Sequence, residues 1–230
     1  MIAEGLVAEL VLLDRSAAAR IRCPQGVVPA AGQYVLAHAP GSDAQLATAL
    51  FSAGAASDGF TAASPVPVAW LPGTRLNLRG PLGHGFLLPP EARRVALLAL
   101  EGSPAVVLSL LEACVRQEAS VTLIGRSIPE DLPLQVEAQP AEALQEVCAW
   151  ADYVAMDVPR ESLEDVKELF GGMKLAMKCR GQVLVRTPMP CGALAACGVC
   201  TVQVGGKALL ACDDGPVFDL YQLMGWSSRA

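Results

Sequence analysis

The sequence predicts a β barrel, followed by an α/β unit and a small cysteine-rich C-terminal domain. Short apolar segments separated by proline and glycine run through residues 1–90, which is typical of a small antiparallel barrel. Residues 91–175 alternate continuous apolar runs with amphipathic stretches, as a doubly wound parallel sheet does. Residues 176–230 contain four closely spaced cysteines, which mark a third unit.

The composition excludes several classes of protein. Hydrophobic residues make up 53% of the 230 residues and charged residues 17%, so the chain can build a real core. The net charge of −6 and the 5% aromatic content argue against binding nucleic acid. The sequence contains no uncharged apolar run of about 18 residues, and Met1–Glu4 has neither the basic nor the apolar part of a secretion signal. We therefore expect a cytoplasmic protein with no membrane span.

Local patterns place the expected strands and helices. Proline and glycine delimit the barrel strands, and continuous apolar runs mark the sheet strands. Gly205 and Gly206 fit the turn of a hairpin. The expected strands are 8–13, 33–37, 67–70, 75–78, 95–100, 121–124, 153–156, 182–185, 201–204 and 208–210.

Three helices are expected in the α/β unit. Ser103 suits the position before a helix and Pro104 its first turn. The apolar face of this first helix would consist of Val107, Leu108, Leu111 and Val115. The other two helices are expected at 141–150 and 160–170, the last with Leu163, Val166 and Phe170 turned inward and ending at Gly171-Gly172.

The eight cysteines divide into two groups. Without a secretion signal, a disulfide framework is not expected. Cys23, Cys114 and Cys148 stand in apolar surroundings and are interpreted as small core residues. Cys179 stands near the second group, so it is a candidate spare or alternative ligand, but a free thiol is its simplest interpretation.

The second group has the spacing C-x5-C-x2-C-x11-C. This is close to the C-x4-C-x2-C and later fourth cysteine of plant-type two-iron ferredoxins. The small residues between the cysteines would let the backbone wrap a cluster closely. We therefore predict a 2Fe-2S cluster held by Cys191, Cys197, Cys200 and Cys212. Because C-x2-C also occurs in zinc sites, a structural zinc remains the alternative.

Three segments together resemble one family, the electron-transfer subunit of class 1B dihydroorotate dehydrogenase. The cysteine loop, with its ending Cys212–Phe218, resembles the family's C-terminal domain. Arg79–Phe86, preceded by Pro72–Leu76, resembles the loop that closes the family's flavin barrel, and Ala31–Val35 resembles an early barrel strand. The domain order is also similar. The resemblance covers most of the chain and is strong at the barrel loop and the tail.

The resemblance implies a ferredoxin reductase-like protein with FAD in the barrel, NAD in the α/β domain and a two-iron cluster in the tail. It implies a hetero-oligomer in which electrons pass between NAD and an FMN-containing catalytic subunit that oxidises dihydroorotate, a step of pyrimidine biosynthesis. His84 would touch the flavin or the partner, and Asp213 and Asp214 would position the partner unless they only form a turn. The residues matched to the flavin site are Ser52, Gly80, Pro81, Leu82, Gly83 and Gly85.

The sequence departs from the family at both nucleotide sites. Ala49 stands where the family's flavin-binding Arg-Pro-x-Ser stretch has its arginine. The loop Glu101–Ala105 has one glycine and an acidic residue in place of a glycine-rich phosphate loop. Met156–Pro159 replaces a Cys-Gly-Pro element that lies beside the nicotinamide in the family. We therefore expect no NAD binding.

The resulting hypothesis is an iron–sulfur subunit that relays electrons to or from a dihydroorotate dehydrogenase-type catalytic subunit. It is a component of an oxidoreductase rather than a complete enzyme, and no catalytic side chain is predicted. Two alternatives remain: a complete FAD- and NAD-dependent reductase, and a structural subunit that binds zinc.

Overall fold

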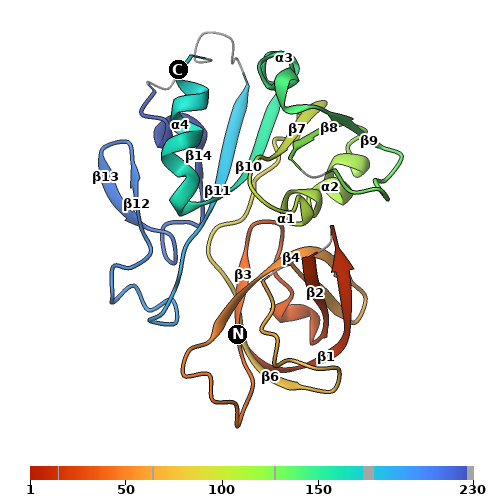
Figure 1. Ribbon diagram of the computed structural model, residues 1–230, viewed down its shortest axis with the longest axis vertical. Helices are drawn as coiled ribbons and strands as arrows, with labels where there is room; N and C mark the ends of the chain where they lie inside the picture. The colour runs from red at the N-terminus through yellow and green to blue at the C-terminus, as the bar shows by residue number, and fades with distance from the viewer. Residues whose placement is uncertain (15, 64, 127, 173–178, 227–230) are drawn as a thin grey trace.

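Two β layers organise the chain, and the cysteine-rich tail lies beside both of them (Figure 1). The computed structural model describes residues 1–14, 16–63, 65–126, 128–172 and 179–226. The barrel occupies one end of the molecule in Figure 1 and the α/β sheet the other. The barrel and the α/β sheet that the sequence predicts are both confirmed.

The first layer is a closed antiparallel barrel with the strand order β1-β2-β5-β4-β3-β6. Its inward side chains follow the two-residue period of a strand: in β6, Leu76 and Leu78 are buried, whereas Arg75 and Asn77 are exposed. The strands are β1 (Ile2–Leu13), β2 (Ser16–Arg22), β3 (Tyr34–His38), β4 (Thr48–Ala56), β5 (Gly59–Ala62) and β6 (Arg75–Leu82), with a short 3-10 turn at Gln25–Val27.

The second layer is a six-stranded sheet with the order β14-β11-β10-β7-β8-β9. All neighbouring pairs are parallel except β11 with β14. Its central strands are buried on both faces, which explains their continuous apolar sequences. The strands are β7 (Arg94–Ala99), β8 (Ser120–Gly125), β9 (Val136–Gln139), β10 (Tyr153–Pro159), β11 (Arg180–Arg186) and β14 (Val217–Asp219). Thus β11 and β14 join this sheet from within residues 176–230.

The helices of the α/β unit are short, and none of those described is long and apolar enough to cross a membrane. As expected, Leu163, Val166 and Phe170 of α4 are buried. The helices are α1 (Ala105–Leu108), α2 (Leu111–Arg116), α3 (Leu144–Trp150), α4 (Leu163–Gly171) and α5 (Leu220–Leu223), with 3-10 turns before α3 and α4.

The single helix expected after Ser103 is wrong, because the structure divides it into α1 and α2. Leu110 N donates to Val107 O at 3.1 Å, a contact of the tighter 3-10 type, which rotates the second half relative to the first. Cys114 consequently faces the core, whereas Val115, expected to be inward, is 46% exposed.

Another expectation is wrong in the barrel: residues 67–70 form a turn and not a strand. Trp70 N donates to Pro67 O at 3.0 Å, and Pro65 and Pro67 carry no N–H with which to extend a ladder. The hairpin of β12 (Thr201–Val204) and β13 (Lys207–Leu210) is confirmed, with Gly205 and Gly206 both at positive φ in its turn.

One continuous apolar core joins the two layers. It includes the sheet, its helices and the tail, and it extends into the barrel through Tyr34, Phe51 and Phe86. The helix α1 packs against the barrel strand β4 at this junction. A second, separate core fills the barrel itself. The junction therefore fixes the barrel relative to the α/β unit and to the cysteine-rich tail.

Replacing Phe170 by alanine tests the packing of α4. Because Phe170 is fully buried, Phe170→Ala should lower the free energy of unfolding by about 3–5 kcal/mol. The neighbouring Leu169 is 51% exposed, so Leu169→Ala should change it by no more than about 0.5 kcal/mol. Urea denaturation followed by circular dichroism measures both. Equal effects of the two variants would contradict the orientation of α4.

Candidate iron–sulfur site

The hairpin β12–β13 brings two of the predicted ligands together. Cys200 directly precedes β12 and Cys212 follows β13, and the ladder between the strands continues through Ala211 N, which donates to Cys200 O at 3.0 Å. Cys200 and Cys212 are both buried. Their proximity therefore follows from the register of the hairpin rather than from their spacing in the sequence.

The other two predicted ligands lie in the loop between β11 and β12. Cys191 is half-buried and Cys197 exposed. Four residues of this loop have left-handed backbone conformations, which places successive N–H groups on one side of the chain. Two of these residues are alanines, for which such a conformation is strained. The left-handed residues are Gly192, Ala193, Ala195 and Gly198.

The four thiols interact in two neighbouring pairs. Cys197 acts on the pKa of Cys191 and Cys200 on that of Cys212, and Cys191 also acts on Cys212, so the two pairs lie near each other. Backbone N–H groups, first that of Ala196 and then that of Leu194, lower the pKa of Cys191 to about 6. Burial, together with the neighbouring Cys200, raises the pKa of Cys212 to about 11. The N–H groups around Cys191 thus favour its thiolate form.

This donor set fits an iron–sulfur cluster. A two-iron cluster needs four thiolates, two for each iron, and N–H groups directed at its sulfur atoms. A structural zinc needs four ligands around one point. In the part of the chain that the structure describes, no three histidine, cysteine or carboxylate side chains are placed to hold a metal ion. The fit to an iron–sulfur cluster therefore rests on the four neighbouring thiols and on the N–H groups around Cys191.

Three barrel side chains hold the cysteine-rich tail through its backbone. Arg79 Nη2 donates to Gly192 O at 2.6 Å and to Ala193 O at 3.3 Å. The Tyr34 hydroxyl donates to Cys212 O at 3.2 Å. His84 N donates to Gly215 O at 2.6 Å, and its ring Nδ1 lies 3.1 Å from Asp214 O. We call Tyr34, Arg79 and His84 the barrel clasp.

The glycines matched to the flavin site pack against the protein itself. A Cβ on Gly80 would lie 2.5 Å from a Val35 side-chain carbon. Gly83 has a φ of +71°, and a Cβ there would lie 2.5 Å from Pro216 Cδ. A Cβ on Gly85 would lie 2.6 Å from Ala31 O. These glycines allow close contact between the barrel loop, the barrel and the tail, while Pro81 and Leu82 complete β6.

Ser52 lines a cavity of about 430 Å³ between the barrel and the helix α2, together with Phe86. Its hydroxyl accepts a hydrogen bond from Gly54 N at 3.1 Å. Glu112 and Arg116 are the charged side chains of this cavity, and they pair with each other at 3.8 Å. The cavity thus has no net positive charge to offer a pyrophosphate, so its residues do not fit the phosphates of FAD.

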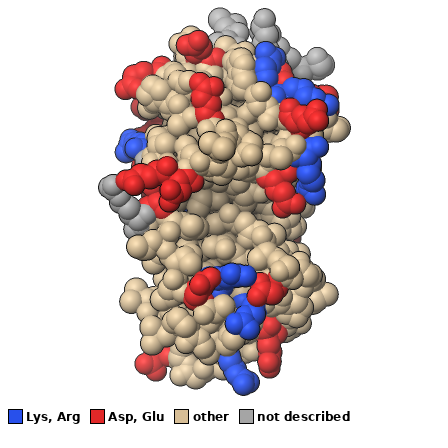
Figure 2. Space-filling view, turned by 90° about the vertical axis from the view of Figure 1, so that its right-hand side faces the viewer, with Lys and Arg blue, Asp and Glu red and all other residues tan. Residues whose placement is uncertain are grey.

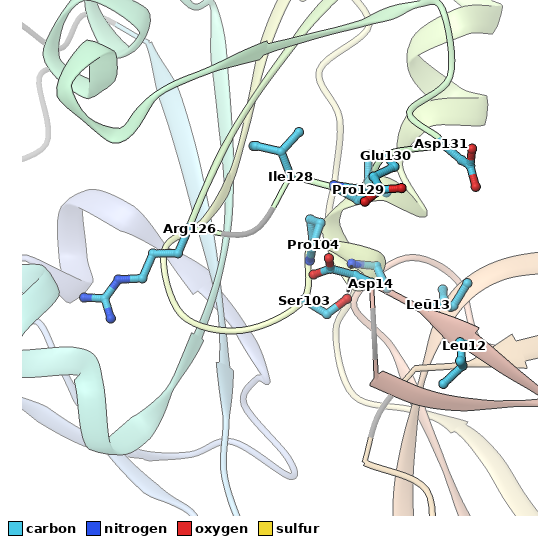
Figure 3. A pocket seen from close by; sticks show the side chains of 13 residues that line it. Leu12, Leu13, Asp14, Ser103, Pro104, Arg126, Ile128, Pro129, Glu130 and Asp131 are labelled. Atoms are coloured by element: carbon cyan, nitrogen blue, oxygen red, sulfur yellow. Dashed lines mark hydrogen bonds between the residues drawn. The ribbon is translucent and has the colours of Figure 1, made fainter.

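A second junction cavity, of about 560 Å³, is acidic (Figure 3). Asp14, Glu130 and Asp131 line it, against one arginine. That arginine, Arg126, extends away from Asp14 in Figure 3 and pairs with Glu101 at 3.0 Å. On the face shown in Figure 2, charges of both signs are scattered, with no basic patch. Among its described lining residues, acidic side chains thus outnumber basic ones.

An ion pair occupies the carboxyl edge of the parallel sheet, where Met156–Pro159 ends β10. Arg186 Nε donates to the buried carboxylate of Asp157 at 2.7 Å, and Arg186 Nη2 donates to Glu101 O at 3.4 Å. Burial raises the pKa of Asp157 to about 6, although Arg186 opposes the shift. This ion pair therefore lies within the segment that the resemblance matches to the family's nicotinamide element.

The remaining sequence-predicted residues have structural places. Cys114 and Cys148 are buried, as expected, whereas Cys23 is only half-buried. Cys179 is buried with its Sγ 3.9 Å from Cys148 O, inside the α/β core and not among the thiol pairs. Asp214 forms the expected turn: its carboxylate accepts from Leu210 N at 2.7 Å. Its action on a partner stays a prediction, as does that of Asp213.

Sequence reasoning missed Tyr34, Arg79, Asp157 and Arg186. Arg79 directly precedes the recognised Gly-Pro, but nothing local shows that its partner lies 113 residues away. Asp157 stood within the departure from the family pattern without being recognised as charged and buried. A buried carboxylate in a β strand is the one signal that could have pointed to a pairing partner.

Two comparisons with known proteins bear on different parts of the chain: one on the cysteine-rich tail and the other on the overall fold. Residues 187–224 match the iron–sulfur cluster binding domain of dihydroorotate dehydrogenase B. Over these residues the tail is therefore similar to that cluster-binding domain, which confirms the resemblance recognised in the cysteine loop.

The fold is shared with ferredoxin reductases. A structure of an NADH-dependent reduced ferredoxin-NADP oxidoreductase, studied for flavin-based electron bifurcation, has a TM-score of 0.74 at 16% identity and covers 95% of this chain and 88% of its own. The ferredoxin reductase in carbazole 1,9a-dioxygenase has a TM-score of 0.61 at 18% identity, covering 76% and 66%. A ferredoxin NADP+ reductase from Neisseria gonorrhoeae with bound FAD and NADP has a TM-score of 0.57 at 16% identity, covering 80% and 98%.

Asp157→Asn tests the buried ion pair through pH. The folded protein keeps the Asp157 proton up to a pH of about 6, whereas an ordinary carboxyl releases it near 3.8. The contribution of this group to stability is therefore complete below pH 4 and is lost as the pH rises towards 6 and above. Between pH 4 and pH 7, wild type should lose on the order of 2–3 kcal/mol relative to Asp157→Asn.

Denaturant unfolding of both proteins at each pH gives this difference, in which pH effects common to both cancel. Asp165→Asn, which changes an exposed carboxylate of α4, is the matched control and should run parallel to wild type. A constant difference between wild type and Asp157→Asn across this range would contradict the raised pKa.

Proposed function

We propose that this chain is an iron–sulfur electron-transfer subunit that relays single electrons to or from an FMN-containing, dihydroorotate dehydrogenase-type catalytic subunit in the cytoplasm. The observation that carries the proposal is the pairing of four cysteines in a loop lined by N–H groups, within the segment that matches the cluster-binding domain of dihydroorotate dehydrogenase B. The reductase fold gives this segment a rigid support.

Cys191 and Cys197 would hold one iron of a 2Fe-2S cluster, and Cys200 and Cys212 the other. When bound, such a cluster accepts and donates one electron at a time. The loop between Cys191 and Cys197 supplies the N–H groups that stabilise the thiolate charge. Its small side chains leave these groups accessible from inside the loop.

The cysteine loop is also the surface on which we place the partner. Met189–Cys200 contains no charged residue, and Leu194 is 67% and Val199 41% exposed. Exposed apolar side chains beside a redox site favour docking, because the partner removes them from water and brings its own cofactor close. Asp213 and Asp214 lie exposed beside Cys212, where they can orient a partner that carries positive charge.

We propose that NAD binding is lost. The loop that would cradle its pyrophosphate carries Glu101, which pairs with Arg126, and the Asp157–Arg186 ion pair occupies the sheet edge. The complete reductase is the second candidate. Its supporting observation is the cavity between Ser52 and Phe86 in a fold shared with FAD-containing reductases. Against it, the described lining residues of the two junction cavities carry no excess of positive charge.

Metal analysis of cysteine variants tests the cluster. Anaerobically reconstituted wild type should contain about two irons and two acid-labile sulfides per chain. Cys197→Ala and Cys212→Ala should each lose most of both, because one iron would keep a single thiolate. Cys179→Ala is the control and should retain full content, since Cys179 lies in the α/β core. About one zinc per chain and no sulfide would instead support the structural subunit.

Cofactor content distinguishes the two redox candidates. We expect the purified protein to release well below one flavin per chain and to show no saturable NADH binding by calorimetry, with any dissociation constant above about 1 mM. The physical reason is that, among the described residues that line the two cavities, Arg116 and Arg126 are already paired with Glu112 and Glu101. The apoprotein should be titrated with FAD as well, to detect flavin lost on purification. Flavin at one per chain together with saturable NADH binding would establish the complete reductase.

A further inference from the structure

Arg79 places a positive charge against the cysteine loop. It lies in β6, immediately before Gly80, and is largely withdrawn from solvent. Its Nη2 contacts the carbonyls of Gly192 and Ala193, which directly follow the predicted ligand Cys191. Within the described residues both partners are neutral, and the ion pairs found there involve other arginines and lysines.

The same guanidinium has a buried donor without an acceptor. Arg79 Nε is inaccessible to solvent and makes no hydrogen bond to any described residue. Leaving a buried donor of a charged group unsatisfied costs about 1–3 kcal/mol or more. The other buried polar side-chain atoms in this condition among the described residues are the hydroxyls of Ser42 and Thr187. Among the described residues, Arg79 is thus the charged side chain with a buried N–H donor that has no acceptor.

Two barrel side chains reach the tail next to the predicted ligands. Arg79 contacts the carbonyls that follow Cys191, and the Tyr34 hydroxyl donates to Cys212 O at 3.2 Å. Tyr34 is fully buried. The guanidinium therefore lies beside the predicted ligands at a place where burial weakens the screening of its charge.

We propose that Arg79 is a positioning residue for the iron–sulfur group: its Nε–H donates to a sulfur atom of that group, and its charge raises the reduction potential. This inference rests on the proposed function, because it requires a cluster in the cysteine loop. Four thiolates, two sulfides and two ferric ions carry a net negative charge, which becomes one unit more negative when one electron is accepted. A fixed, poorly solvated cation stabilises the more negative form.

The consequence is measurable as a midpoint potential. Replacing Arg79 by glutamine removes the charge that stabilises the reduced cluster. At a given potential, the ratio of oxidised to reduced cluster should therefore rise about tenfold, which is a shift of the midpoint potential by about −59 mV for one electron. Arg79→Lys keeps the charge without the Nε donor and should recover part of the shift. Arg75→Gln, at the exposed start of the same strand, is the matched control and should leave the potential unchanged.

The sign of the shift in midpoint potential distinguishes loss of the Arg79 charge from a loop that has only become looser. If Arg79→Gln only freed the loop, water would reach the cluster and would itself stabilise the more negative form, so the potential would not fall. Iron content is measured on every sample. An unchanged or raised potential in a fully loaded Arg79→Gln protein would overturn the proposal.

A second measurement uses the wild-type chain and does not depend on the stability of a variant. Pulsed paramagnetic resonance of the reduced protein, prepared with 14N- or 15N-arginine, should show a weak arginine nitrogen coupling. Since residues 187–200 contain no arginine, backbone nitrogens of the loop cannot supply this signal. The coupling should persist in Arg160→Lys, which removes the guanidinium that donates to Val199 O. A loaded wild-type protein without the coupling overturns the Arg79 proposal alone, whereas a wild-type protein without iron overturns the proposed function.

Discussion

The attachment of the cysteine loop to the barrel is the constraint on which the site depends. The loop contains two alanines in left-handed conformations and lies mostly exposed, so its own packing cannot hold it. The barrel clasp supplies the missing restraint through backbone carbonyls: Arg79 holds the start of the loop, Tyr34 holds Cys212, and His84 holds the turn that follows. Because the contacts are made to the backbone, the cysteine side chains remain available as ligands. The fold thus separates the residues that position the loop from those that bind.

This attachment also explains why the loop that resembles a flavin-barrel loop is rich in glycine. Gly83 and Gly85 leave no room for a side chain, because Pro216 and Ala31 O occupy the space. The same loop pairs with the tail through the bridge between His84 and Pro216. A glycine-rich segment of this kind is required by the joint between barrel and tail, whether or not the barrel binds a nucleotide. The likeness at this loop therefore supports the domain arrangement more strongly than it supports FAD.

The sequence predicts those parts of the structure that depend on residues close together in the chain. The buried strands β7 and β10, the Gly205-Gly206 hairpin and the α4 face all follow from a short pattern. The alanine-rich strands β2 and β4 gave no such signal, because small residues alternate weakly in hydrophobicity. At the site, spacing identified the four cysteines as a set, but their pairing, the barrel clasp and the Asp157–Arg186 ion pair join distant segments. Such contacts depend on the topology, which no local window contains.

The proposed loss of NAD binding makes the attachment of the cysteine loop more important. If the cluster is the chain's redox centre, electrons must enter and leave across protein surfaces, and the exposed loop must hold its shape while partners bind. Two arginines from different layers restrain its two ends: Arg79 of the barrel binds Gly192 O, and Arg160 of the α/β unit binds Val199 O. The apolar tip between them presents Leu194 without charges that a partner would have to desolvate. Even without bound nucleotides, the fold would then still hold the cysteine loop in place, because the barrel and the α/β unit each bind one end of it.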